Sequence, residues 1–333
     1  MNFTLLPRAL LVIVASAVLA ACGGDGGSGQ ETGTLKLSIT DAAIDSTDAV
    51  FVKFTGVELK PRGGPAFSVD FTVPPIDLLL YQGTNSVALL DGQKVPAGEY
   101  EWMRLKVQAD PNDDGDSYID INGSICELRI PSGDETGLKL IRPFTVGVGA
   151  ITALTIDFDL RKSIVQPPGQ TTQVATCGGE VYLLKPVLRL IDDLQVGTIT
   201  GTVDSTLVTQ QCTAASDEAE VSPGNVYLFG PYTTAPVPGD PDDVDGTDAT
   251  DGPLDWAKVA LDGSSNYRYT FGFVPQGEYV LAYTCSPDRP EYDADEADEP
   301  VGADEVVTFA PSTGITATVT ANQTTTVPEI TTP

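Results

Sequence analysis

The sequence predicts an all-β protein with two β-sandwich domains of the Greek-key type behind a short leader. Apolar residues recur in short alternating runs such as "TLKLSIT" and "YVLAYT", and no long run has a helical period. The chain carries 25 Pro and 33 Gly against 2 Met, and turn signals such as "RGGP" and "PSGD" separate the runs. Its 333 residues suffice for about two domains of ~150 residues each.

The leader is predicted to be a signal peptide over residues 1–21. It has one basic residue, Arg8, before an apolar stretch over residues 9–18 that is too short to span a bilayer comfortably. Small residues follow this stretch and precede Cys22. The pattern indicates secretion, which an ordinary signal peptide with an incidental cysteine would also give.

Residues 19–22, "LAAC", resemble the lipobox of bacterial lipoproteins, which implies acylation of Cys22 and cleavage before it. Several acyl chains together anchor a protein stably to a membrane. Enteric lipoproteins that stay in the inner membrane have Asp where this chain has Gly23, so the resemblance implies the outer membrane of a Gram-negative cell envelope. We expect residues 22–32 to form a flexible tether of roughly 15–20 Å.

Two series of strands follow, with a domain boundary near Gln195 that separates residues 33–195 from residues 196–333. Strands of the first series are expected at residues 34–40, 49–60, 101–109, 126–130, 151–160 and 179–191. Strands of the second series are expected at residues 197–203, 225–230, 267–274, 278–284, 305–310 and 315–320. Strands at this spacing favour a sandwich or a related barrel.

A short motif occurs once in each series, as "VPAGEY" at residues 95–100 and as "VPQGEY" at residues 274–279. Each places a Pro-x-Gly turn directly before a strand that begins with Glu-Tyr. We interpret the pair as shared turn chemistry that leads into a core strand, with internal duplication as the alternative.

Several blocks of the first series resemble a known family. They are "GTLKLSITDAAIDSTDAVFVKFTGVEL", "VPAGEYEWMRLKV", "PSGDETGLKLIRPFTV", "LTIDFDLRKSIV" and "YLLKPVLRLI". Together they look like domain of unknown function 4382 over about residues 33–191. This family belongs to bacterial lipoproteins, so the resemblance implies a secreted, anchored β domain without an established activity. The chain departs from the family in an acidic insert after Ala109.

The second series resembles the carboxypeptidase regulatory-like domain, a transthyretin-like sandwich, over about residues 197–327. The blocks "GTITGTV", "SPGNVYLFG" and "DGSSNYRYTFGFVPQGEYVLAYTC" follow the order of that family, although acidic insertions interrupt them. In other proteins this module packs or binds and supplies no catalytic residues. Related sandwiches bind glycans, which introduces carbohydrate as a ligand class by analogy.

Four cysteines remain if Cys22 is acylated, and each predicted domain holds two. Three connectivities exist, and independent folding of the domains favours Cys126 with Cys177 and Cys212 with Cys285. A location outside the cytoplasm permits these disulfides to form. Metal ligation is the alternative, but the chain has no CxxC spacing and no histidine.

The stretch "DPNDDGDSYID" at residues 110–120 has the spacing of a calcium loop at its beginning. Oxygen ligands would come from Asp110, Asn112, Asp114, Asp116 and Asp120, and Ca²⁺ is the candidate cofactor. The bidentate acid expected at the twelfth position is absent, and a solvated hairpin loop is the alternative. Acidic blocks at residues 240–255 and 288–305 are expected to stay solvated, with weak calcium collection as the alternative.

Composition also restricts the function. The chain has no histidine, which removes Ser-His-Asp and Cys-His catalysis and His-ligated zinc. Its 47 acidic residues against 18 basic ones give a net charge of -29, which disfavours nucleic acid as a partner.

Three functional hypotheses follow from these observations. The first is a non-catalytic, lipid-anchored cell-envelope protein with a structural, adhesive or ligand-binding role. Acyl chains on Cys22 would attach it to the membrane, and glycans or other envelope proteins are its possible partners. The second is a carbohydrate-binding module that exposes the aromatic side chains of Tyr232, Trp256, Tyr267 and Tyr269 on one sheet face. The third is a carboxylate-based hydrolase with two acids roughly 5–10 Å apart across a cleft.

Overall fold

A computed structural model describes most of the chain beyond the leader. The described residues are 30–42, 47–109, 117–121, 123–130, 137–165, 182–185, 187–215, 223–231, 253–285 and 309–331. The chain divides into two units, Met1–Gln30 and Glu31–Pro333, and the second unit contains all the described strands and helices. Within the described residues, no helix has the length and apolar character needed to cross a membrane.

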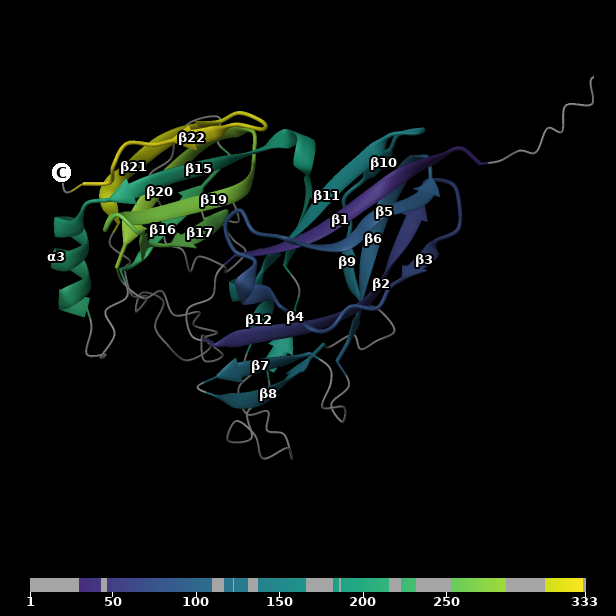
Figure 1. Ribbon diagram of the computed structural model, residues 1–333, viewed down its shortest axis with the longest axis horizontal. Coiled ribbons are helices and arrows are strands. Elements are labelled where there is room, and N and C mark those ends of the chain that lie inside the picture. The colour runs from purple at the N-terminus through teal and green to yellow at the C-terminus, as the bar shows by residue number, and fades with distance from the viewer. Residues whose placement is uncertain are drawn as a thin grey trace, which may run out of the picture. The chain divides into compact units, whose positions relative to one another are not determined.

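The first series of strands forms two sheets (Figure 1). A four-stranded sheet has the order β14-β11-β1-β5, and a ten-stranded sheet has the order β10-β6-β2-β7-β8-β13-β12, with β3 and β4 paired to β2 and β9 paired to β6. The strands are β1 (Thr32–Ala42), β2 (Ala49–Pro61), β3 (Phe67–Asp70), β4 (Ile76–Asp77), β5 (Val87–Pro96), β6 (Gly98–Gln108), β7 (Tyr118–Ile121), β8 (Ser124–Arg129), β9 (Leu138–Leu140), β10 (Phe144–Val146), β11 (Ile151–Asp159), β12 (Ile164–Val165), β13 (Tyr182–Leu184) and β14 (Leu188–Asp192). The short helices η1 (Leu78–Leu80) and α2 (Leu160–Ser163) connect them.

The second series forms two four-stranded sheets with the orders β18-β19-β15-β22 and β17-β16-β20-β21. Helix η3 (Asp193–Gln195) separates the two series, and helix α3 (Ser205–Ala215) follows the first strand of the second. The strands are β15 (Val196–Val203), β16 (Asn225–Phe229), β17 (Asp255–Lys258), β18 (Ala260–Leu261), β19 (Tyr267–Pro275), β20 (Gly277–Thr284), β21 (Ala310–Val319) and β22 (Thr324–Thr326). The prediction of an all-β sandwich protein is confirmed, whereas the domain division at Gln195 stays a prediction.

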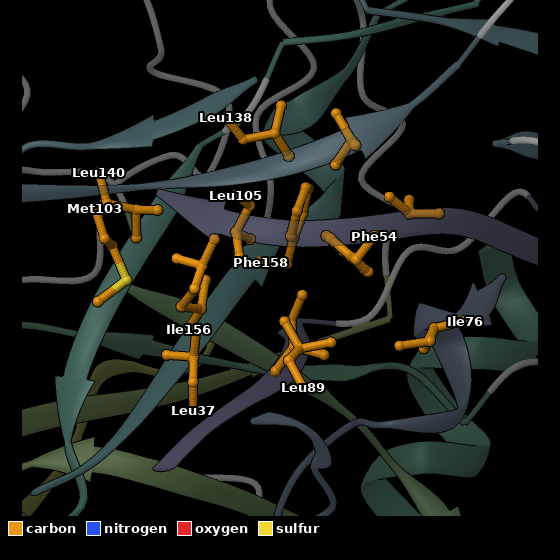
Figure 2. Close-up of a cluster of buried hydrophobic side chains, with 14 of the residues drawn as sticks. Leu37, Phe54, Ile76, Leu89, Met103, Leu105, Leu138, Leu140, Ile156 and Phe158 are labelled. Carbon is orange, nitrogen blue, oxygen red and sulfur yellow. The ribbon is translucent and has the colours of Figure 1, made fainter. Parts of the chain in front are cut away.

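The core of the first series lies between its two sheets. The alternation in β1 places Leu35, Leu37 and Ile39 on one face, and all three side chains are fully buried. Figure 2 shows Leu37 of β1 and Ile156 of β11 on one side of this cluster, with Met103 and Leu105 of β6 facing them. Each buried Leu or Ile contributes roughly 1.5–3 kcal/mol relative to an exposed position, so this interface holds the sheets together.

The repeated Pro-x-Gly motif has the same structure in both series. Tyr100 opens the buried part of β6, and its hydroxyl donates a hydrogen bond of 2.7 Å to the carbonyl oxygen of Pro96. Tyr279 does the same in β20, with a bond of 2.7 Å to Pro275. Each turn is therefore closed by a tyrosine four residues after its proline and leads into a core strand.

Helix α3 is an element that the strand pattern did not predict. The carboxylate of Asp204 accepts hydrogen bonds from the backbone N–H groups of Thr206 and Leu207, at 2.8 and 3.2 Å, and caps the helix. Leu207, Val208 and Cys212 are buried against the core of the second series. The helix thus joins the sandwich through one apolar face.

Candidate binding site at a buried acidic cluster

Charged side chains from four strands meet at one place in the unit Glu31–Pro333. Register explains part of this, because Asp157 of β11 stands opposite Arg189 in the antiparallel neighbour β14 and opposite Thr40 in the parallel neighbour β1. Asp41 follows Thr40, Asp159 ends β11, and Asp255 begins β17, a strand that contacts β1. We call Asp41, Asp157, Asp159, Arg189 and Asp255 the acidic junction.

Arg189 is the cation at the centre of the acidic junction. Its Nη2 atom forms an ion pair with Oδ2 of Asp157 and lies 3.6 Å from Oδ2 of Asp255. Burial alone would lower the pKa of Arg189, but the carboxylates of Asp157 and Asp255 more than reverse this and raise it. The guanidinium therefore stays charged and bridges two aspartates that come from the two series of strands.

Burial makes the charged form of Asp255 and Asp41 in the acidic junction unfavourable. Burial raises the pKa of Asp255 to about 7, with Asp157 adding to the rise and Arg189 opposing it. Burial also raises the pKa of Asp41 well above its usual range, and Asp157, Asp159 and Asp255 add to this rise. One arginine thus compensates only part of the negative charge.

Asp41 differs from the other members because its carboxyl group has no hydrogen-bond partner. The residue is 4% exposed, and neither Oδ1 nor Oδ2 is hydrogen-bonded. The backbone N–H of Leu160 lowers the pKa of Asp41 in part, without reaching hydrogen-bonding geometry. Burying a polar group without a partner costs free energy, and the cost is smaller for the protonated carboxyl group than for the carboxylate.

A cavity of about 380 Å³ adjoins the acidic junction. Asp41, Asp157 and Asp255 line it, together with the segment 82–85 and residues of β17 and β19. Thr40 fixes this segment, since its hydroxyl lies 2.9 Å from the carbonyl oxygen of Tyr81 and 2.8 Å from that of Asn85. The volume is typical of small-molecule sites.

Two glycines allow backbone to approach backbone beside the cavity. A Cβ atom on Gly272 of β19 would lie 2.2 Å from the carbonyl oxygen of Gly83, and Gly83 itself has a φ of +64°. Any side chain at position 272 would therefore force β19 away from the segment 82–85.

We expect Gly272→Ala to lower the free energy of unfolding by about 1–3 kcal/mol, because an added methyl group has no space here. Urea denaturation measures this change. Gly263→Ala is the control, since a Cβ atom on Gly263 has nothing within 4 Å. Equal, small effects of both substitutions would show that the close contact at Gly83 is not needed.

The structure tests one of the two predicted disulfides directly. Cys212 of α3 is bonded to Cys285, which follows β20, with a Cα–Cα distance of 5.1 Å. Cys126 is fully buried and also disulfide-bonded, while its predicted partner, Cys177, lies outside the described residues. Cys22 lies outside them too.

The predicted calcium loop falls mostly outside the described residues, including Asp110, Asn112, Asp114 and Asp116. Asp120 is described and lies in β7, where its carbonyl oxygen accepts a hydrogen bond of 2.9 Å from the N–H of Asp48. Where the chain is described, no group of three or more acidic or cysteine side chains is placed to hold a metal ion. Calcium binding by the loop stays a prediction.

The predicted aromatic platform is wrong for two of its four members. Trp256 is 5% exposed and Tyr269 is 1% exposed, because both belong to buried clusters of the second series. Tyr267 is half-buried, and Tyr232 lies outside the described residues. An open sugar-stacking surface therefore does not include Trp256 or Tyr269, although both residues line the cavity beside the acidic junction.

The expectation that the whole acidic block at residues 240–255 is solvated is wrong for Asp255. Its side chain is 15% exposed and contacts Arg189, so it belongs to the interior. The guanidinium contacts Asp157 and Asp255 through the same nitrogen and occupies the space between them. This pair of acids thus leaves no room for the scissile bond that a carboxylate hydrolase needs.

Sequence reasoning missed Asp41, Asp157 and Arg189 as site residues. Each stands in an alternating strand, where a single charged residue resembles any solvent-facing position. The available signal was an acid and a base in separate strands, "LTIDFDL" and "VLRLI". Only the register of β11 and β14 shows that the two charges meet.

Comparison with known proteins supports the family resemblance of the first series of strands. The model of a family described as a domain of unknown function (DUF4382) matches residues 32–186, in agreement with the resemblance of the first series. No such match supports the resemblance of the second series, which stays a prediction. No curated protein sequence matches the chain.

Solved structures give only weak likenesses. The Bacillus anthracis TIE protein is 11% identical with a TM-score of 0.17, and the match covers 91% of this chain and 34% of that protein. A minor pilin of Streptococcus agalactiae is 10% identical with a TM-score of 0.18, covering 90% of this chain and 96% of the pilin. Scores this low carry no argument about function.

Proposed function

We propose that this protein is a lipid-anchored cell-envelope protein of a Gram-negative outer membrane, in which the β-sandwiches have a non-catalytic structural, adhesive or ligand-binding role. The sequence "LAAC" at residues 19–22 carries the proposal, because it places Cys22 where lipoproteins are acylated. Acyl chains on Cys22 would attach the protein to the membrane.

The arrangement after Cys22 supports this proposal. The Gly-rich stretch at residues 23–32 leads directly to the unit Glu31–Pro333, whose first strand begins at Thr32. A tether that ends where the folded unit begins allows the sandwiches to lie outside the lipid. The match of residues 32–186 to a family without an assigned activity is compatible with a binding role.

The absence of histidine supports the non-catalytic part of the proposal. An enzyme made from this chain would depend on carboxylates or lysine for proton transfer. The acids that the structure brings together at the acidic junction are engaged with Arg189 or buried beside it. Their arrangement suits binding better than turnover.

Expression in a Gram-negative host tests the anchor. The unmodified chain is expected to incorporate labelled palmitate and to sediment with membranes, whereas Cys22→Ala loses the label and becomes soluble. Gly24→Ser, two residues further on, is the control and keeps both properties. Palmitate-free, soluble wild-type protein would refute the anchor.

The same expression strains test in which membrane the protein is located. Separation of inner and outer membranes by density is expected to place the unmodified chain in the outer fraction. Gly23→Asp creates the retention signal that enteric lipoproteins use and is expected to move the chain to the inner fraction. Identical fractionation of both forms would contradict outer-membrane sorting.

A further inference from the structure

We propose that the loop between β10 and β11 contacts the lipid surface to which the chain is anchored. The β10–β11 loop comprises residues 147–151, the last of which is the first residue of β11. The inference rests on the proposed acylation of Cys22 and deepens it, because it states which end of the first sandwich lies against the membrane. Exposed apolar side chains, the place where the tether meets the folded unit and the charges around that place support it.

The β10–β11 loop exposes large apolar side chains. Val148 is 61% exposed and Ile151 is 62% exposed, and Ala150 between them is exposed as well. Residues 143–156, "PFTVGVGAITALTI", contain no charged residue, although a fifth of the chain is charged. Apolar side chains in an uncharged loop lose contact with water when the loop enters the interface of a lipid bilayer, which favours such contact.

Backbone hydrogen bonds fix the β10–β11 loop beside the first residues of β1. The N–H of Gly149 donates to the carbonyl oxygen of Thr32 at 2.9 Å. The N–H of Thr34 donates to the carbonyl oxygen of Ala150, also at 2.9 Å. The parallel register places Ile151 opposite Thr34, so β11 begins beside the beginning of β1 (Figure 1). The loop therefore lies at the end of β1 where the chain enters the folded unit.

The length of the expected tether limits how far this end can lie from the lipid. Ten residues separate Cys22 from Thr32, and a flexible chain of this length has an end-to-end distance of roughly 15–20 Å. With Cys22 in the membrane, the β10–β11 loop would lie within reach of the lipid. The other end of β1 is roughly 35 Å away along the strand, which has 11 residues.

The charges around the β10–β11 loop are balanced. The segments that reach this end of the sandwich are residues 31–34, 61–64, 94–100 and 143–153. Their charged residues are Glu31, Arg62, Lys94 and Glu99, two of each sign, whereas the whole chain has a net charge of -29. A bilayer with anionic lipids repels an acidic surface, so this end of the sandwich approaches it at a lower electrostatic cost.

An artificial anchor makes the test independent of acylation. Residues 22–333 with Cys22→Ala and a histidine tag at the N-terminus are attached to phosphatidylcholine vesicles that contain a nickel-chelating lipid. The chain has no histidine of its own, so only the tag binds the nickel. A chain that is not acylated in cells would refute the proposed function and leave this measurement unaffected.

A polarity-sensitive dye on Ala150→Cys reports contact with lipid and leaves Val148 and Ile151 in place. Its emission is expected to shift to shorter wavelength when the protein is attached to vesicles, and nitroxide-bearing lipids are expected to quench it. The same dye on Leu80→Cys is the control, because Leu80 is 66% exposed and precedes Tyr81, whose carbonyl oxygen accepts a hydrogen bond from Asp41 at the other end of β1. No shift at position 150, or equal shifts at both positions, would overturn the proposal.

Variants show whether the apolar side chains cause the contact. Val148→Asp with Ile151→Asp, in the protein labelled at Ala150→Cys, is expected to abolish the emission shift, because two carboxylates replace apolar groups at the lipid interface. Leu80→Asp with Leu261→Asp adds the same charge at two exposed apolar positions and is expected to keep the shift. Leu261 is 59% exposed and borders the same cavity as Asp41, away from the loop. Equal losses in both double variants would contradict a contact through the β10–β11 loop.

Amide hydrogen exchange on the unlabelled, tagged protein does not depend on any substitution in the loop. Exchange at residues 147–151 is expected to slow when the protein is attached to vesicles, and exchange at residues 78–81 is expected to stay the same. If exchange at residues 147–151 slows with rising protein concentration in the absence of vesicles, a second copy of the chain covers the loop. That result, or unchanged exchange on vesicles, would overturn the proposal.

Discussion

Replacing Arg189 by methionine is expected to lower the free energy of unfolding by about 3–5 kcal/mol at neutral pH. The substitution keeps an unbranched side chain but leaves Asp157 and Asp255 buried without their cation. Asp41 and Asp159 stand nearby and add further negative charge. Urea denaturation followed by circular dichroism measures the loss.

Two comparisons identify its cause. Arg62→Met removes an arginine from an exposed ion pair with Glu99, where both side chains are more than half exposed, and should cost less than about 1 kcal/mol. Adding Asp157→Asn and Asp255→Asn to Arg189→Met should restore most of the stability, because the two carboxylates that Arg189 contacts are then neutral. If the triple variant stays as unstable as Arg189→Met, the loss reflects packing rather than charge.

The stability of the protein is expected to fall as the pH rises from about 4 to about 7. The unfolded pKa of an aspartic acid is about 3.9, whereas burial raises the folded pKa of Asp255 to about 7 and that of Asp41 in the same direction. Between these values the folded state holds a proton that the unfolded state has lost. For Asp255 the free energy of unfolding changes by about 1.4 kcal/mol per pH unit, and the contribution of this residue is complete below pH 4 and lost by about pH 7. The raised pKa of Asp41 acts in the same direction.

Among the residues that the structure describes, the other acids with a shifted pKa do not cancel this trend in the same pH range. Hydrogen bonds from the backbone of Asn266 and Ser264 lower the pKa of Asp262 to about 2, so its contribution is lost only below pH 4. Burial raises the pKa of Asp193, which acts in the same direction as Asp255. The melting temperature should therefore be higher at pH 5 than at pH 8.

Scanning calorimetry at constant ionic strength checks this pH profile. The double variant Asp41→Asn, Asp255→Asn should have a flatter profile and a higher melting temperature than the unmodified protein at pH 8. Asp70→Asn, an exposed acid paired with Lys106, is the control and should keep the slope. A melting temperature that rises from pH 5 to pH 8 would refute the buried, protonated state of the acidic junction.

Local patterns predicted the long alternating strands because they report burial on one face, whereas β5 and β17 were not among the expected strands. The alternation of Leu35, Leu37 and Ile39 identifies β1, and the Pro-x-Gly-Glu-Tyr motif identifies the beginnings of β6 and β20. Helix α3 was missed because Thr206, Val208 and Thr209 are β-branched and favour strands. The signals for a helix, a capping Asp204 and a short apolar face, are weaker than this composition.

The acidic junction could not be predicted because it depends on pairing between distant strands. In the sequence, Asp41 is one of 47 acids, and Asp255 ends a block whose charges repel each other. Their burial follows from the position of β17 against β1. Trp256 was assigned to an exposed surface for the same reason, since the sequence does not show which side of β17 is covered.

The parallel strand pairs have a consequence for folding kinetics. β1 pairs in parallel with β11, more than 100 residues later, and β15 pairs in parallel with β22, near the end of the chain. Contacts between residues so distant in sequence form slowly, so β1 and β15 each lack one neighbour until β11 and β22 arrive. Such intermediates aggregate readily, and a net charge of -29 keeps neighbouring copies apart while the sheets close.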